Sequence, residues 1–216
     1  MVKGLLGRKL GMTRMFTEEG SWIPVTVLEV GPCTVVQRKT AAADGYDAVQ
    51  LGFGELKESR CTKPIRGHFA GNGKEKPAVA PKRVLREFRV DPSDELKRGD
   101  EIRVDIFKAG EHVDIAGITK GKGFQGVQKR HGFSGGPAAH GSMLHRAPGS
   151  IGTSATPSRT LKGRKLPGHM GSVRVTVRNL AVVRVDPDKN LLIVQGGVPG
   201  TNSGLVEVKK SLKGAK

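Results

Sequence analysis

The sequence is short of acidic residues, aromatic residues, cysteine and long apolar runs. It holds 20 Asp and Glu against 37 Lys and Arg, a formal net charge of +17 at pH 7. A charge this large repels itself, so it indicates a polyanionic partner. No apolar run reaches the roughly 20 residues that a membrane-spanning helix needs, and no basic amphipathic helix is evident. A nucleic acid is therefore a better candidate for the partner than a membrane surface.

The few cysteines and aromatic residues set further limits. Cys33 and Cys61 have no second Cys or His at metal-ligand spacing. Residues 1–8 lack the apolar core of a signal peptide, so the chain is expected in the cytoplasm with both thiols reduced and packed. Aromatic residues make up 4% of the chain and hydrophobic residues 36%. Part of the chain is therefore expected not to pack against itself.

Strand-like segments dominate both ends of the sequence. Residues 22–30 are rich in β-branched side chains and residues 33–39 follow after a Gly-Pro pair, so the two are predicted to be neighbours across a tight turn. Other predicted strands are residues 46–53, 101–107, 112–118, 173–185, 191–194 and 205–208. Short strands separated by turn signals are typical of a closed or nearly closed β-barrel. Residues 55–94 are predicted to be a mixed insertion, in which residues 81–90 fit a helix or a strand equally well.

Between the strand-rich segments lies an unbroken basic stretch. Residues 120–172 hold twelve glycines and nine Lys or Arg, and no Asp or Glu occurs between Asp114 and Asp186. Such a segment cannot bury enough apolar surface to offset the entropy lost on ordering, so it is predicted to be an extended arm that orders against an anionic partner. A linker between two domains is the alternative, but linkers are seldom exclusively positive over this length. Residues 1–119 and 173–216 are therefore predicted to form one β-barrel domain.

Two short patterns resemble enzyme motifs without the context that the chemistry needs. Residues 121–126 match the dinucleotide-binding pattern G-x-G-x-x-G, but a poor helix follows and no acid occurs before Asp186. Residues 132–136 match the hydrolase pattern G-x-S-x-G, but no histidine follows any downstream acid. The four histidines of the arm match no metal-ligand spacing. The sequence therefore predicts no catalytic residue, no metal site, no cofactor and no small-molecule substrate.

The arm is predicted to bind folded RNA through its basic side chains. Phe124 and Phe133 are its only aromatic residues, so contacts to phosphates are expected to outweigh base stacking. A glycine-rich arm without a recognition helix fits irregular RNA better than a regular DNA groove. The predicted RNA-binding side chains are Lys120, Lys122, Lys129, Arg130, His131, His145, Arg146, Arg159, Lys162, Arg164, Lys165 and His169. Lys3, Arg8, Lys9 and Arg14 either join them or form a solvated face.

Several motifs are specific enough to indicate a family. Residues 107–130, FKAGEHVDIAGITKGKGFQGVQKR, resemble the characteristic motif of the large-subunit ribosomal protein L3 family. Residues 4–16, 63–69, 145–152 and 162–171 resemble other parts of the same family. The resemblance covers nearly the whole chain, whose length is close to that of bacterial members.

The resemblance implies a six-stranded, translation-protein-like β-barrel on the rRNA surface, with a long loop that reaches toward the peptidyl transferase centre. It also implies rRNA binding near the 3′ end early in assembly, contacts with large-subunit proteins fourteen and nineteen, a place in the cytoplasmic ribosome, and no catalysis. By motif position the loop tip comprises Gly149, Ser150, Ile151, Gly152, Thr153, Ser154, Ala155 and Thr156. Some bacterial members carry a methylated glutamine where this chain has Ala155, so that modification is not expected. The alternatives are a translation or RNA-modifying factor with a similar barrel, and a nucleoid-type DNA binder.

Overall fold

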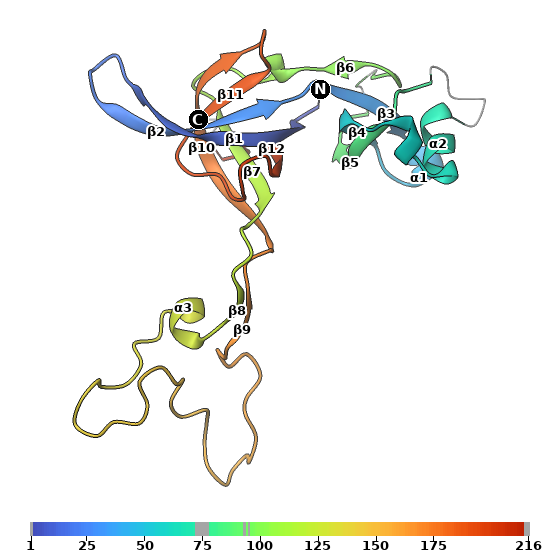
Figure 1. Cartoon of the computed structure of the whole chain (residues 1–216). Helices are drawn as coiled ribbons and strands as arrows, with labels where there is room; N and C mark the ends of the chain where they lie inside the picture. Colours follow the sequence, from blue (N-terminus) through green and yellow to red (C-terminus); the bar gives the residue numbers. More distant parts are fainter. Residues whose placement is uncertain (1, 72–77, 93, 95, 214–216) are drawn as a thin grey trace. The chain divides into compact units, whose positions relative to one another are not determined.

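The chain divides into two compact units in a computed structural model that describes residues 2–71, 78–92, 94 and 96–213 (Figure 1). Unit 1 comprises Met1–Ile118 and Arg174–Lys216, and unit 2 comprises Thr119–Val173. None of the helices in the described residues is long and apolar enough to cross a membrane.

Unit 1 contains a closed antiparallel barrel in the order β1-β12-β7-β10-β11-β2. Its strands are β1 (Gly4–Phe16), β2 (Trp22–Val30), β7 (His112–Ile118), β10 (Arg174–Asp186), β11 (Leu191–Gln195) and β12 (Leu205–Lys210). The prediction of a mainly β chain with a closed barrel is therefore confirmed.

The burial pattern of the barrel strands follows their hydrophobic alternation. Leu192 and Val194 are buried in β11, and Val206 and Val208 are buried in β12. Because successive side chains of a strand point to opposite faces, every second apolar residue fills the barrel interior. The side chains between them lie nearer the surface.

A second sheet of unit 1 has the strand order β5-β4-β3-β6. Its strands are β3 (Cys33–Lys39), β4 (Ala48–Glu55), β5 (Lys82–Arg89) and β6 (Glu101–Ile102), and the short helices nearby are α1 (Ala41–Asp44), η1 (Glu58–Arg60), α2 (Lys63–Ala70) and η2 (Val104–Ile106). Buried residues of this sheet, such as Leu51 and Phe88, belong to the same core cluster as Leu5 and Leu28 of the barrel. Unit 1 is thus built on one main hydrophobic core that spans both sheets.

The predicted pairing of residues 22–30 with 33–39 is wrong. β2 lies in the barrel, whereas β3 pairs with β4 and β6 in the second sheet. Gly31 lies between them with φ +80°, and a Cβ there would come within 3.2 Å of the Ile102 carbonyl oxygen. A glycine therefore lets the chain turn from one sheet into the other where most residues would be strained.

Three other strand predictions change. The sequence indicated no strand at the N-terminus, but β1 occupies Gly4–Phe16. Only Glu101–Ile102 of the strand predicted at 101–107 forms, and a 3₁₀ helix follows. The choice left open at 81–90 resolves to strand β5, because it pairs with β4 along its length. Part of the segment left open, residues 72–77 and 93, lies outside the described residues.

Unit 2 has little regular structure. It contains the two-stranded sheet of β8 (Gly123–Gln125) and β9 (Gly168–Met170), and the helix α3 (Val127–His131). A long irregular loop joins α3 to β9 (Figure 1). The sequence indicated a poor helix after residue 126, and the helix that forms there has five residues.

Candidate nucleic-acid interface

Unit 2 exposes most of its side chains and buries almost none. Across Thr119–Val173, all of which the structure describes, Val127 is the one buried residue, at 1% exposure. Of the twelve side chains predicted to bind RNA, ten are exposed, while Arg130 and His131 are half-buried. The predicted tip, residues 149–156, is exposed at every position.

Backbone hydrogen bonds close the two ends of unit 2 onto each other. The Thr119 amide donates to the Val173 carbonyl at 2.9 Å, and the Lys122 amide donates to the Met170 carbonyl at 2.9 Å. Gly171 has φ +77°, and a Cβ at this position would collide with the Lys120 carbonyl oxygen. Only glycine allows both the left-handed backbone and this close approach.

Arg130 and His131 tie α3 to the chain that leads into β9. The Arg130 guanidinium donates to the Leu166 carbonyl at 2.7 Å, and His131 Nε2 lies 3.0 Å from the same oxygen. Because a carbonyl only accepts, His131 Nε2 carries the proton in this contact. Both side chains therefore hold the fold of unit 2, and Arg130 keeps further N–H groups for another acceptor.

The His145 region forms a second internal anchor. His145 Nδ1 lies 3.0 Å from the Pro137 carbonyl, which makes Nδ1 the donor. The Gln128 side-chain amide donates to the His145 carbonyl at 3.1 Å, and the Gly136 amide donates to it at 3.3 Å. Gln128 was not among the predicted site residues, because a polar residue in a short helix gives no sequence signal of such a contact.

The tip is linked to the returning chain by one basic residue. The Arg164 guanidinium donates to the Ser150 carbonyl, and the Ser150 hydroxyl donates to the Gly152 carbonyl at 3.3 Å. Arg164 thus combines a predicted phosphate contact with a role in shaping the tip.

The charges of the two units are balanced differently. Residues 119–173 contain nine Lys and Arg and no Asp or Glu, so their charge cannot be neutralised within unit 2. In unit 1, by contrast, Arg174 pairs with Glu207 at 2.6 Å and Lys210 pairs with Glu111 at 3.0 Å. Burial alone would raise the pKa of Glu111, but hydrogen bonds from Lys210 and the Lys108 amide outweigh it and lower the pKa.

The basic N-terminal residues are largely engaged within unit 1. Lys3 pairs with Asp91 at 3.3 Å. Lys9 is buried and its ammonium donates to the Val198 carbonyl at 2.8 Å, so it forms no part of a solvated face. Arg14 is exposed on β1. Ion pairs thus offset part of the positive charge of unit 1, whereas the nine cations of unit 2 have no acid in their own unit to pair with.

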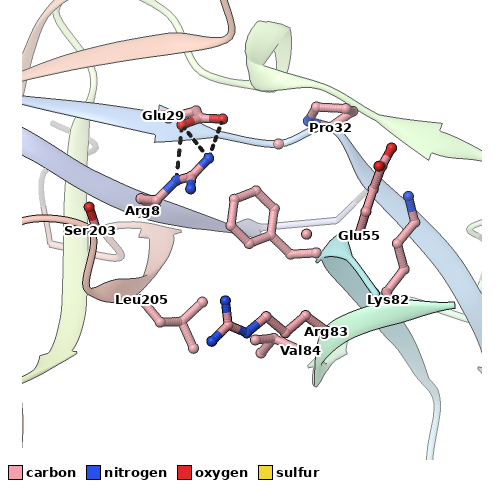
Figure 2. A pocket seen from close by; sticks show the side chains of 12 residues that line it. Arg8, Glu29, Pro32, Glu55, Lys82, Arg83, Val84, Ser203 and Leu205 are labelled. Carbon is pink, nitrogen blue, oxygen red and sulfur yellow. Dashed lines mark hydrogen bonds and ion pairs between the residues drawn. The ribbon is translucent and has the colours of Figure 1, made fainter. Parts of the chain in front are cut away.

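A cavity of about 560 Å³ in unit 1 has a different character (Figure 2). Figure 2 shows Arg8 directed at Glu29, with which it makes two hydrogen bonds of 3.1 Å. The lining also includes Glu55 and Arg83, together with the buried side chain of Phe53. A lining of both signs with an internal ion pair gives no basis for binding a polyanion, so unit 2 is the better candidate for that interface.

Comparison with known proteins identifies the family. A family model described as ribosomal protein L3 matches residues 89–190. The large ribosomal subunit protein uL3 of Carboxydothermus hydrogenoformans is 57% identical over 214 residues, which cover 99% of this chain and 100% of that protein. The chain belongs to the ribosomal protein L3 family.

The L3 match includes the whole of unit 2, since residues 119–173 lie within the matched residues 89–190. Membership of the L3 family, a family of ribosomal structural proteins, confirms the prediction that the chain is not an enzyme. It also argues against the two alternatives of a translation factor and a nucleoid-type DNA binder.

Proposed function

We propose that this chain is a structural component of the large subunit of the cytoplasmic ribosome, and that unit 2 binds the large-subunit rRNA. The observation that carries the proposal is the nine Lys and Arg of residues 119–173, which have no Asp or Glu among them. Because these side chains are largely exposed, they are available to phosphates. Neutralising phosphates with Lys and Arg releases counterions, which drives binding.

The finer roles follow from likeness to the L3 family. The chain nucleates early assembly near the 3′ end of the rRNA, contacts large-subunit proteins fourteen and nineteen, and extends its tip toward the peptidyl transferase centre. Ile151, Thr153, Ser154 and Ala155 carry no general acid or base, so the tip acts on catalysis only through the packing of the rRNA. Bulky substitutions in the tip are therefore expected to change sensitivity to drugs that bind at that centre.

The salt dependence of rRNA binding tests the role of unit 2. The triple variant K162A/R164A/K165A removes three exposed cations, and each lost phosphate contact lowers the log–log slope against salt by nearly one unit, about three in total. The matched control K162R/R164K/K165R keeps the charge and is expected to keep the slope. A slope that is the same in the alanine variant as in the wild type refutes the assignment.

Sedimentation of the full chain tests its place in the ribosome. Cell lysate is separated on a sucrose gradient at moderate salt, and the chain is quantified by mass spectrometry. The proposal requires stoichiometric recovery with large subunits and whole ribosomes after a salt wash. Recovery near the top of the gradient indicates a factor instead.

A further inference from the structure

The end of the β1–β2 hairpin extends past its neighbours in the barrel. β12 pairs with β1 over Gly4 to Arg8, and β11 pairs with β2 over Val25 to Glu29. From Gly11 onward in β1 the register continues with β2 alone among the described strands, up to the pair Phe16 and Trp22. Val25 is the last β2 residue paired with β11, so residues 14–16 and 22–24 beyond it form a two-stranded ribbon, drawn in blue beside the β2 label in Figure 1.

One face of this ribbon is apolar and exposed. The register places Phe16 opposite Trp22, and Arg14 opposite Pro24. Side chains directly opposite each other in an antiparallel pair point to the same face, and so do residues two apart in one strand. The exposed part of this face, called the hairpin face below, consists of Met12, Arg14, Phe16, Trp22 and Pro24; Thr26, opposite Met12, is buried and marks its inner limit. Met12 is 55% exposed, Phe16 73% and Trp22 60%.

Hydrogen bonds close the turn between the two aromatic residues and fix the backbone there. The Thr17 amide donates to the Ser21 carbonyl at 2.7 Å, and the Thr17 hydroxyl donates to the same oxygen at 3.0 Å. The Gly20 amide donates to the Thr17 carbonyl at 3.0 Å. Because Phe16 and Trp22 flank this closed turn, little backbone ordering remains to be done on binding.

The composition of the hairpin face is that of a protein interface. Interface cores are enriched in aromatic residues, Met and Arg. Truncation of an interface Trp or Arg to alanine is among the changes that lower the binding free energy most. A two-stranded hairpin is also marginally stable in water by itself, and a partner on its apolar face supplies the missing packing. The only Trp of the chain lies on this exposed ribbon rather than in the core.

Charge decides which kind of partner fits. Glu18 and Glu19 are exposed at the turn, and within the described part of the chain no salt bridge engages either of them. Residues 10–26 contain two acids and one cation, Arg14, so the hairpin has a net negative charge although the whole chain has a net charge of +17. Trp22 and Phe16 offer stacking surfaces for bases, but RNA would bring phosphates close to the two carboxylates, where they are repelled. A basic protein brings Lys and Arg to the same place.

We propose that the hairpin face docks a basic protein that presents an apolar patch bordered by Lys or Arg. Phe16, Trp22 and Met12 bury the patch, and Glu18 and Glu19 attract its basic border. The inference rests on the proposed function, because it places the partner within the same ribosomal subunit.

A photo-crosslinker in the hairpin face tests the proposal in the full chain. Phe16→p-benzoylphenylalanine is compared with Leu212→p-benzoylphenylalanine, a control at a 90% exposed side chain outside the hairpin. Salt-washed large subunits are irradiated and the adducts are mapped by mass spectrometry. We expect adducts from position 16 in an apolar segment flanked by Lys or Arg of a basic protein, at least about tenfold above the control. Adducts on rRNA, adducts on a second copy of this chain, or no excess over position 212 overturn the proposal.

Two sets of variants test the contacts separately, with crosslinking from position 12. E18K/E19K is expected to lower the protein adduct roughly fivefold, because two exposed ion pairs are lost. F16S/W22S is expected to lower it about tenfold or more, since it removes the aromatic anchors, while L212S leaves it unchanged. A protein adduct that E18K/E19K leaves unchanged or raises overturns the assignment of a basic partner.

The gradient that supplies the subunits separates this inference from the proposed function. Absence of the wild-type chain from the large-subunit fraction refutes both. Presence of the chain at full stoichiometry without a specific protein adduct refutes only the docking surface.

Discussion

At the scale of single residues, a cluster on the second sheet links Lys39, Tyr46 and Glu87. The Lys39 ammonium donates to the Tyr46 hydroxyl at 2.9 Å and pairs with Glu87 at 2.9 Å, while the Tyr46 hydroxyl donates to Glu87 at 2.8 Å. The hydrogen bonds from Lys39 and Tyr46 lower the pKa of Glu87. Hydrogen bonds to Tyr46 and Glu87 in turn raise the pKa of Lys39.

The lowered pKa of Glu87 predicts a pH dependence of stability. A carboxyl group with a lower pKa in the folded state stabilises the fold above its ordinary value of 4.5, and that contribution disappears as the pH falls through the folded-state value. Glu87→Gln is therefore expected to lower the free energy of unfolding at pH 7 by up to about 1 kcal/mol, and by less in acid. Urea unfolding at pH 7 and below pH 4 measures this, with Glu101→Gln as the control for a longer 3.7 Å pair. A loss of equal size at both pH values contradicts the prediction.

Cys33 is predicted to be unreactive in the folded protein. The residue is fully buried and burial raises the pKa of its thiol to about 11, although the nearby Lys82 charge opposes the shift. The thiol donates a hydrogen bond to the Leu6 carbonyl at 3.4 Å. The thiolate is the reactive form, so iodoacetamide at pH 8 is expected to label Cys33 only after unfolding. Mass spectrometry with and without urea checks this. Rapid labelling of the folded chain would show that the thiol is accessible. Cys61 is also buried, which confirms the expectation that both thiols are packed.

Among the elements, the pairing of the two ends of unit 2, residues 119–123 and 170–173, requires a glycine at position 171. Gly171 and Gly163 both have positive φ, at +77° and +81°, but only a Cβ at Gly171 meets a neighbouring backbone atom. Gly171→Ala therefore adds a collision to the left-handed strain that both substitutions introduce. The two positions form a matched pair that separates conformational strain from close packing.

Gly171→Ala is expected to lower the free energy of opening of the β8–β9 pair by at least about 1 kcal/mol more than Gly163→Ala does. This difference makes the state with β8 and β9 unpaired about five times more populated. Limited proteolysis of the full chain measures this as faster cleavage within residues 119–173. Binding of rRNA is expected to weaken in the same order. Equal cleavage of the two variants would show that the contact with Lys120 does not matter.

The sequence predicted strands correctly where apolar and polar residues alternate clearly. β11 and β12 alternate apolar and polar residues, and their positions followed from that period. β1 begins GLLGRKLG, where three glycines interrupt any alternation, and it forms a strand because β2 and β12 pair with it on both sides. The pairing of β3 was mispredicted because proximity in sequence indicates a neighbour but does not decide which sheet a strand joins.

Across the whole molecule, the main hydrophobic core lies in unit 1, whereas unit 2 carries cations without any acid. Every residue of the main core cluster belongs to unit 1. Unit 2 holds nine of the chain's Lys and Arg and none of its Asp and Glu. Removing unit 2 is therefore expected to leave the folding of unit 1 nearly intact and to weaken RNA binding.

A direct turn between β7 and β10 tests this separation. Ile118 and Arg174 are paired across the two strands, so an Asn-Gly turn in place of residues 119–173 suits a two-residue hairpin. The shortened chain is expected to unfold cooperatively within a few degrees of the full chain, while its rRNA affinity falls and its salt slope flattens. Circular dichroism melting and filter binding measure the two effects. Loss of cooperative unfolding would show that unit 2 supports the core.

The amino-acid sequence is sufficient to show that the chain is basic and mainly β, that residues 120–172 carry positive charge without acids, and that its motifs are those of the L3 family. These properties are local, since they depend on composition, on two-residue periodicity and on residue order. The folded chain was needed to show that β2 and β3 join different sheets, that Lys9 is buried, and that Arg130 and His131 bond to the Leu166 carbonyl. It also brought Phe16 and Trp22 together on an exposed ribbon. Each of these depends on contacts between distant parts of the chain, which sequence periodicity does not record.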